Sequence, residues 1–145
     1  MAFPSLQFST DKARLDRPII HAFLRDEAPW AKGISREVVE RAIEGSLCFG
    51  AYLGDEQVAF ARLVTDHATF AYLCDVLTLP AYRGRGYAKA LMEYVFAEPA
   101  LARLRRIVLV TSDAHVLYRP VGFAALAQPE RYMELHRPDV YSAAQ

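Results

Sequence analysis

The sequence predicts an α/β protein with one mixed sheet and helices on the faces of that sheet. Two observations carry this prediction. Residues 47–65 have the pattern of two apolar strands joined by the turn Gly54-Asp55-Glu56, which is typical of an antiparallel hairpin. Residues 70–111 have the pattern of a strand, a helix and a second strand, and such a crossover usually joins parallel strands. A chain that combines both patterns is expected to form a mixed sheet.

The size and composition of the chain fit a single domain that spans residues 1–145. With 145 residues, of which 53% are hydrophobic and 23% charged, the chain can bury a core, and neither a disordered nor a fibrous class is expected. The 17 Lys and Arg residues balance 17 Asp and Glu residues. This balance argues against a general nucleic-acid binder, but it leaves room for a local basic site.

One strand and two helices are expected in the first third of the chain. Residues 6–9 alternate apolar and polar side chains, as in a short strand. Asp16 is placed to cap a helix that ends before Pro29. Ser35 is placed to cap a second helix, for which Gly45 provides the stop.

The remaining elements follow from apolar runs and helical spacing. Residues 106–111 form a near-continuous apolar run, as expected of a strand that is buried on both faces. Asp113 is expected to cap a short helix over residues 114–119. The other predicted elements are strands at 47–53, 58–65, 70–79, 123–126 and 132–135 and a helix at 88–96.

Neither a metal site nor a membrane span is expected. Cys48 and Cys74 lie in apolar stretches outside any Cys/His cluster, and they are expected to be buried thiols. A structural zinc site needs about four ligands at short spacing. No run approaches the roughly 18–20 apolar residues that would span a bilayer, and the chain does not open with the pattern of a signal peptide. We therefore expect a soluble, cytoplasmic protein without a metal, membrane or nucleic-acid partner.

The most informative segment, residues 83–88, lies between a predicted strand and a predicted helix. Its sequence is Arg-Gly-Arg-Gly-Tyr-Ala. Glycine leaves the backbone free to curl around a ligand, and the first amides of a helix have no partner within the helix. Together with the helix dipole and two arginines, they predict a site for phosphate or pyrophosphate. The segment lacks the Gly-Lys-Ser/Thr end of a P-loop and does not open a repeated βαβ unit, and a plain surface turn is the alternative.

A second motif follows in the last third of the chain. The pattern Ala-x-x-x-Tyr-x-x-x-Gly-Phe is matched by Ala114, Tyr118, Gly122 and Phe123, and the pattern Arg/Gln-x-x-Gly-x-Gly/Ala by Arg83, Gly86 and Ala88. Through these two motifs, their separation and the order of elements, the chain resembles the GNAT superfamily of N-acetyltransferases from about residue 6 to about residue 135. The resemblance implies a mostly antiparallel sheet of six to seven strands with a parallel, splayed pair, flanked by about four helices. It also implies that acetyl-CoA binds where the pair splays.

The resemblance further assigns residues to the cosubstrate. Backbone groups of the strand before the loop would pair with the pantetheine arm, and amides of the loop and of the helix start would hold the pyrophosphate. Thr111 stands where many members carry an Asn that bonds to the pantetheine arm, and Thr has less reach. The assigned residues are Val76, Leu77, Leu79, Arg83, Gly84, Arg85, Gly86, Tyr87, Ala88, Lys89 and Thr111.

Two residues are candidates for catalysis. The resemblance assigns Tyr118 as the acid that protonates the CoA sulfur, and a phenol with an ordinary pKa of about 10 is protonated at neutral pH. Asp75 lies in an apolar run, where burial would raise the pKa of its carboxyl group and suit it to act as a base. An ion pair with Arg62 is the alternative role for Asp75. Weaker candidates for the base are Tyr72, Asp113 and His115, and water alone can also serve.

The function implied by the resemblance is acetyl-CoA-dependent acetylation of a primary amine. A small-molecule acceptor is favoured because the chain has no extra domain to recognise a large one. The amine is expected to attack the thioester directly, since no nucleophile is placed for a covalent intermediate. In this family the region of His21 and Trp30 lines the acceptor pocket, and members often form homodimers. The alternatives are a regulatory module that binds acyl-CoA without turnover and a binder of some other phosphorylated ligand.

Overall fold

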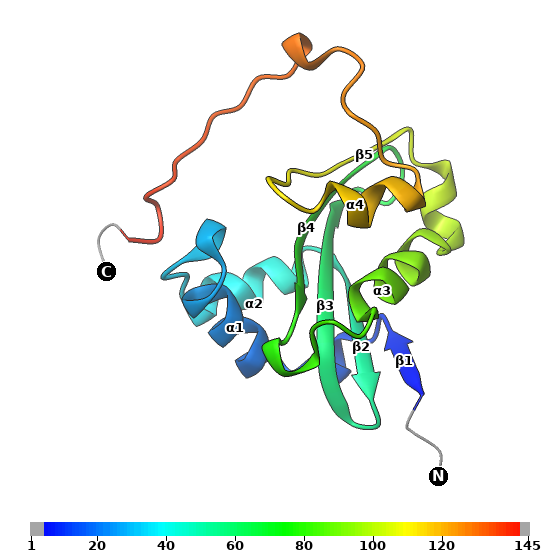
Figure 1. The fold of residues 1–145 in the computed structure, drawn as a ribbon. Helices are drawn as coiled ribbons and strands as arrows, with labels where there is room; N and C mark the ends of the chain where they lie inside the picture. The colour runs from blue at the N-terminus through cyan, green and yellow to red at the C-terminus, as the bar shows by residue number, and fades with distance from the viewer. Residues whose placement is uncertain (1–4, 143–145) are drawn as a thin grey trace.

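A computed structural model describes residues 5–142 and shows a five-stranded sheet (Figure 1). The strands are β1 (Leu6–Ser9), β2 (Leu47–Leu53), β3 (Glu56–Thr65), β4 (Phe70–Thr78) and β5 (Arg106–Val108). They lie in the order β1-β2-β3-β4-β5, with antiparallel pairing up to β4 and parallel pairing between β4 and β5. The predicted mixed sheet with one parallel pair is therefore confirmed.

Helices cover both faces of this sheet. The α-helices are α1 (Arg17–Asp26), α2 (Arg36–Glu44), α3 (Tyr87–Phe96) and α4 (His115–Tyr118). Side chains alternate between the two faces along a strand, so the sheet contributes apolar side chains to two cores, one on each face. Phe60 and Leu77 pack with α1 and α2 in one core, whereas Phe49 and Ala59 pack with Leu91 of α3 in the other. Figure 1 shows α1 and α2 on one side of the strands and α3 on the other.

The first two helices begin where the sequence places them. The Asp16 carboxylate accepts a hydrogen bond from the N–H of Ile19 at 3.2 Å, and the Ser35 hydroxyl accepts one from the N–H of Val38 at 3.2 Å. Gly45 follows the last residue of α2. Each helix start therefore has its predicted side-chain cap, which satisfies one of the amides that a helix leaves without a partner.

The parallel pair is short and then opens. β5 pairs with β4 only from Phe70 to Tyr72. β4 continues to Thr78 with β3 as its partner on one side. Within residues 5–142, the other edge of β4 is unpaired from Leu73 onward. This is the splayed pair that the sequence resemblance implies, and it exposes backbone groups beside the loop that leads into α3.

The C-terminal part of the chain differs from the sequence prediction. The strand expected at 106–111 ends at Val108, and Val110 is 82% exposed instead of buried. The strands expected at 123–126 and 132–135 are absent, so the described part of the chain has five strands and not six to seven. The reason is that these segments have no strand beside them. Every residue from 124 to 140 is exposed.

Residues 124–142 are called the C-terminal arm below. The arm leaves the fold after α4, runs outside the other elements and returns to them near α2 (Figure 1). At its far end the half-buried Tyr141 packs against the core beneath α1 and α2.

The cap of α4 also differs from the prediction. Asp113 does not cap this helix, whose N-cap residue is Ala114 without a side-chain hydrogen bond. The Thr111 hydroxyl instead accepts a hydrogen bond from the N–H of Ala114 at 3.0 Å. The turn before α4 is therefore held by a residue that the sequence assigned to the cosubstrate.

Candidate active site

The loop between β4 and α3 presents unpaired amides at the start of a helix. Gly84 and Gly86 both adopt left-handed backbone conformations, with φ of 77° and 79°. Such angles are strained for residues with a Cβ, so glycine is required here. Gly86 is the N-cap of α3, and no side chain caps this helix. The first amides of α3 are therefore open to a ligand, and the positive end of the helix dipole favours an anion at this position.

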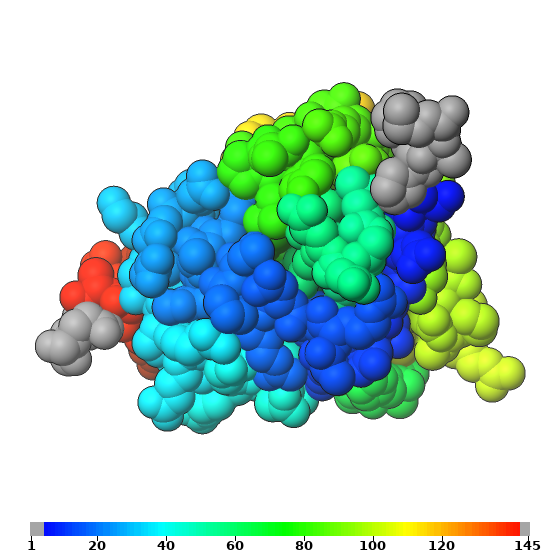
Figure 2. All heavy atoms as spheres, turned by 90° about the horizontal axis from the view of Figure 1, so that it is seen from below, coloured from blue at the N-terminus to red at the C-terminus, as the bar shows by residue number. Residues whose placement is uncertain are grey.

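Two arginines and two aromatic rings frame this loop. Arg83 Nε donates a hydrogen bond to the carbonyl of Thr78 at 3.3 Å, and its guanidinium carbon lies 5.8 Å from the ring centroid of Phe23. Arg85 lies over the ring of Tyr82 at 5.6 Å. Both contacts are weak and leave guanidinium donors free, so the positive charge adds to that of the helix start. Figure 2 shows the green segment with this loop beside the blue helix α1.

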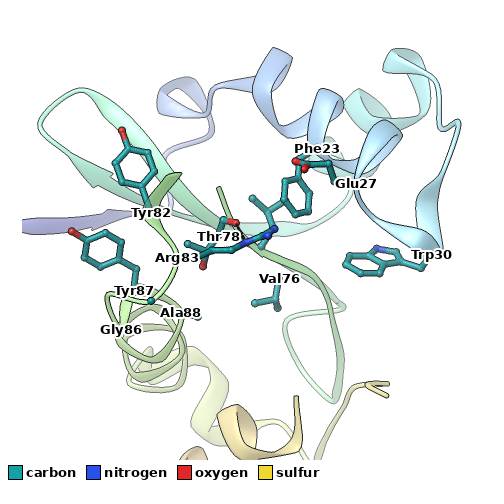
Figure 3. A pocket seen from close by; sticks show the side chains of 12 residues that line it. Phe23, Glu27, Trp30, Val76, Thr78, Tyr82, Arg83, Gly86, Tyr87 and Ala88 are labelled. Carbon is teal, nitrogen blue, oxygen red and sulfur yellow. Dashed lines mark hydrogen bonds between the residues drawn. The ribbon is translucent and has the colours of Figure 1, made fainter. Parts of the chain in front are cut away.

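A cavity of about 410 Å³ lies between α1, β4 and the start of α3. Figure 3 shows Phe23, Glu27 and Trp30 on one side of it and Gly86, Tyr87 and Ala88 on the other, with β4 between them. Seven of the residues assigned from the sequence line it: Val76, Leu77, Arg83, Gly84, Gly86, Tyr87 and Ala88. Leu79, Arg85, Lys89 and Thr111 do not line this cavity.

The residues whose backbone groups face the open edge of β4 differ in part from those assigned from the sequence. The N–H of Leu79 donates to the carbonyl of Val58 at 2.9 Å, so it is directed at β3. Because backbone groups alternate along an antiparallel strand, Leu77 is directed at β3 as well. Thr78 therefore presents its N–H and C=O to the open edge, as does Val76 two residues earlier. Of the three residues of this segment that the resemblance assigns to the pantetheine arm, Val76 faces the open edge, whereas the amides of Leu77 and Leu79 are directed at β3.

β4 also carries a β-bulge beside this edge. Phe60 pairs with Leu77, whereas Arg62 pairs with Cys74, so β4 has one residue more than β3 between these pairs. Asp75 lies in the bulge with φ of 51°, a conformation that is costly for a residue other than glycine. A bulge interrupts the ladder, bends the strand and re-aims side chains, and bulges are frequent next to active sites.

The Asp75 side chain is fully engaged. One carboxylate oxygen accepts from Arg62 Nε at 2.8 Å and the other from Trp30 Nε1 at 3.0 Å. Arg62 also donates to the Ser46 hydroxyl at 3.0 Å. Burial lowers the pKa of Arg62, but the charge of Asp75, the hydrogen bond to it and the neighbouring thiols together outweigh burial, and the pKa is raised. The alternative role from the sequence, an ion pair with Arg62, is therefore the observed one, and it links the sheet to Trp30 at the cavity.

Tyr118 lies in a different place from the loop. It is 8% exposed and packs edge-on against Phe123, with 6.0 Å between the ring centroids. Burial raises the pKa of the Tyr118 phenol, and the negative charge of Asp113 adds to this effect. Tyr118 and Thr111 line a second cavity, of about 320 Å³, beside the end of β5. The structure thus brings most of the loop residues together, while Tyr118 faces a cavity of its own.

Sequence reasoning missed four residues of the first cavity, namely Phe23, Glu27, Thr78 and Tyr82. Phe23 and Glu27 are four positions apart around the end of α1, so they lie above one another on one side of the helix. This spacing is visible in the sequence, but the side that faces the loop is not. Trp30 lines the cavity, whereas the ring of His21 lies 2.9 Å from the carbonyl of Ile34 and lines neither of the two cavities described.

Comparison with known proteins decides the family. The family model described as "Acetyltransferase (GNAT) family" matches residues 16–130, which is most of the chain. This protein belongs to the GNAT acetyltransferase family. Among relatives of this GNAT acetyltransferase, a protein of Gibberella zeae named as an acetyltransferase is 31% identical over 130 residues, covering 76% of this chain and 73% of its own.

Solved structures agree with this assignment. A GNAT-family acetyltransferase of Xanthomonas campestris pv. campestris is 50% identical, with a TM-score of 0.93 over 98% of this chain and 100% of its own. An acetyltransferase of Clostridium acetobutylicum, crystallised with acetyl-CoA, shares the fold at 19% identity, with a TM-score of 0.62 over 91% of this chain and 96% of its own. The GNAT resemblance inferred from two short motifs is confirmed.

The sequence predicts neither a metal site nor a membrane span in this acetyltransferase. Among residues 5–142 there is no cluster of three or more His, Cys, Asp or Glu side chains that could hold a metal ion. Within the same range, no helix has the length and apolar character needed to cross a membrane.

Proposed function

We propose that this GNAT acetyltransferase transfers an acetyl group from acetyl-CoA to the primary amine of a small molecule. The observation that carries the proposal is the juxtaposition of an uncapped helix start with an unpaired strand edge on one cavity. The first suits a pyrophosphate and the second suits the amides of a pantetheine arm. The two free thiols, Cys48 and Cys74, agree with a reducing cytoplasm as its location.

The residues present fit acetyl-CoA. Amides from Gly84 to Ala88 would hold the pyrophosphate, with Arg83 as its nearest cation. Backbone groups of Val76 and Thr78 would pair with the amides of the pantetheine arm, as an added strand would. Arg85 and Lys89 are exposed beside the loop and would add charge at its rim. We assign Thr111 to the turn before α4 instead of to the pantetheine arm.

The acceptor would bind on the α1 side of the cavity. Glu27 offers a carboxylate and Trp30 an indole face, and both are exposed on that side. A carboxylate and an aromatic face together favour an ammonium group. We therefore propose a small cationic amine as the acceptor. The hydrogen bond from Trp30 to Asp75 would fix the indole, which makes Asp75 a positioning residue in place of a base.

The reaction would be direct aminolysis of the thioester. The amine nitrogen bonds to the acetyl carbon, the carbon–sulfur bond breaks, and the departing thiolate takes up a proton. We propose Tyr118 as the donor of that proton. Its burial raises the pKa, so the phenol is fully protonated at neutral pH, as an acid must be. The proton lost by the amine passes to water, because both oxygens of Asp75 already accept hydrogen bonds.

A thiol-release assay with acetyl-CoA and a panel of small amines tests this proposal. Burial raises the pKa of Cys48 to about 11 and that of Cys74 to about 12, so the protein's own thiols contribute little at pH 8. We expect turnover with small cationic amines and a loss of apparent acceptor affinity in Glu27→Gln. Tight CoA binding by calorimetry without turnover on any amine would indicate a regulatory acyl-CoA-binding module instead.

A further inference from the structure

The segment that carries Trp30 has little regular secondary structure. Residues 27–35, called the Trp30 loop below, join α1 to α2 and contain one short turn of 3-10 helix, η2 (Pro29–Ala31). Trp30 lines the first cavity (Figure 3), and its Nε1–H donates to Asp75 at 3.0 Å. Its side chain is 58% exposed, so little packing of its own restrains it. The direction of the indole therefore depends on what holds the loop.

Buried side chains fasten the inner side of the Trp30 loop to the fold. Ala28, Ala31 and Ile34 are 2%, 4% and 6% exposed, and they pack in the core that also contains Phe60 of β3. The outer side of the loop, at Gly33, is exposed. The inner side is thus held by apolar packing, whereas the outer side needs a contact from another part of the chain.

The far end of the C-terminal arm supplies that contact. A Cβ at Gly33 would lie 3.2 Å from the carbonyl oxygen of Tyr141 and 3.8 Å from its carbonyl carbon. Gly33 also has φ of 83°, a left-handed conformation that favours glycine. The backbones of the loop and of the arm therefore approach each other closely, and glycine permits both the approach and the conformation.

Tyr141 also reaches the polar network behind Trp30. It is half-buried, packs on the core of α1 and α2, and lines a cavity of about 40 Å³ together with Arg62 and Asp75. Asp75 is the carboxylate that accepts the indole N–H. Because every residue from 124 to 140 is exposed, Tyr141 is the point at which the arm is anchored again to the fold (Figure 1).

We propose that Tyr141 is a positioning residue for the Trp30 loop. It holds Gly33 from the outside and covers the ion pair of Arg62 and Asp75, which keeps the indole of Trp30 directed into the first cavity. The consequence for catalysis rests on the proposed function, in which Trp30 receives the acceptor amine. A loop that is already ordered loses less conformational freedom when a ligand binds. Tyr141 does not line the first cavity, so it supports acceptor binding through the loop.

The fluorescence of Trp30 tests the positioning role without any enzymatic activity, because Trp30 is the only tryptophan of the chain. In Tyr141→Ala, with its fold checked by circular dichroism, we expect a larger acrylamide quenching constant and a lower anisotropy, since the indole is less restrained. Tyr132→Ala is the matched control. It removes a ring from the same arm at a site beside Arg106, and it should leave both values unchanged. Unchanged quenching and anisotropy in folded Tyr141→Ala would overturn the proposal.

Gly33→Ala tests the same contact from the loop side and does not depend on the folding of Tyr141→Ala. It should also raise the quenching constant of Trp30. Gly54→Ala, with φ of 59° and no atom within 4 Å of an added Cβ, has comparable backbone strain and should not. The double variant Gly33→Ala/Tyr141→Ala should show less than the sum of the two single effects, because both substitutions disrupt one contact. Equal quenching in the two glycine variants, or full additivity in the double variant, would count against the contact.

The kinetic consequence is a difference between the two substrates. For the small cationic amine with the highest turnover, the KM of Tyr141→Ala should rise roughly 10-fold, because the loop must then be ordered on binding. The values of kcat and of the acetyl-CoA dissociation constant should stay near those of the wild type. Altered Trp30 fluorescence with an unchanged amine KM would overturn the role of the loop in acceptor binding. A wild type without turnover on any amine would contradict the proposed function, and the fluorescence comparison would still decide the positioning role.

Discussion

The regions on either side of residue 100 are stabilised in different ways. From β1 to α3, the helices and strands bury a continuous apolar side against one another, and Phe49, Phe60 and Leu91 have no exposed surface. After η4 (Pro99–Arg103), β5 has three residues, α4 has four, and residues 124–140 are all exposed. The first region is complete within one chain. The second has apolar side chains that the described part of the chain leaves exposed, such as Val110, Met133 and Leu135.

The candidate active site lies where these two regions meet. The loop between β4 and α3 and the first cavity belong to the complete region, whereas Tyr118 and its cavity belong to the incomplete one. Cosubstrate binding should therefore depend on the first region, and acid catalysis on the second. Substitutions in each region can test this division of labour.

The largest expected effect is that of Tyr118→Phe. Removing only the hydroxyl should lower kcat by roughly 10²–10⁴-fold if Tyr118 protonates the thiolate. The CoA dissociation constant should be unchanged, because the loop lies in the other region. The matched control is Tyr94→Phe on α3, whose ring stacks on Phe8 at 4.7 Å and which should keep its activity. Near-native kcat in Tyr118→Phe would remove the acid role and make Tyr118 a core residue.

The second largest effect is expected at the ion pair within the complete region. Asp75→Asn keeps a residue that tolerates φ of 51°, but it leaves the charge of the largely buried Arg62 uncompensated. The free energy of unfolding, measured by urea denaturation, should fall by about 3 kcal/mol. Adding Arg62→Met should recover part of the loss, because the unpaired charge is then gone. No recovery would mean that the bulge, and not the charge pair, sets the stability.

The same division explains what the sequence could and could not predict. The caps at Asp16 and Ser35 and the position of the glycine loop between a strand and a helix are local signals, and the structure confirms them. The bulge at Asp75 could not be read, because it depends on the register between β3 and β4. The apolar segments at 123–126 and 132–135 were interpreted as strands of the same sheet. Their composition suits a strand, but the sequence does not state which sheet edge will pair with them.

The roles of individual side chains also depend on contacts between residues that are far apart in the sequence. Asp75 was recognised as unusual, but its partners Arg62 and Trp30 lie 13 and 45 positions away in the sequence. The sequence does not indicate Thr78, because backbone groups of β4 point alternately to its two edges. Which residues face the open edge is known only once the register between β3 and β4 is known. A sequence motif thus located the glycine loop before α3, whereas the residues that the sheet positions could be identified only from the structure.

A smaller effect is expected from replacing glycines with left-handed φ. Gly86→Ala should cost about 1 kcal/mol of stability from backbone strain, since an added Cβ has no atom within 4 Å. It should also raise the CoA dissociation constant by about 10-fold, because the first amides of α3 are displaced. Gly54→Ala, with φ of 59° in the β2–β3 turn and equally open surroundings, should show the same strain but unchanged CoA binding. Equal changes in CoA affinity for the two variants would argue against the loop as the anion site.

The smallest effects are expected from two substitutions near helix starts, one in each region. Ser35→Ala removes a hydroxyl that accepts the N–H of Val38, and it should lower the free energy of unfolding by about 1 kcal/mol. Asp113→Ala should stay within about 0.5 kcal/mol of the wild type, because Asp113 makes no cap hydrogen bond to α4. Its negative charge does raise the pKa of Tyr118, so this variant should lower that pKa slightly, as followed by absorbance of the phenolate at alkaline pH. A loss of about 1 kcal/mol in Asp113→Ala would show that α4 is capped in solution. The second region would then be closer to the first in its local order, and its exposed arm would be the main difference between them.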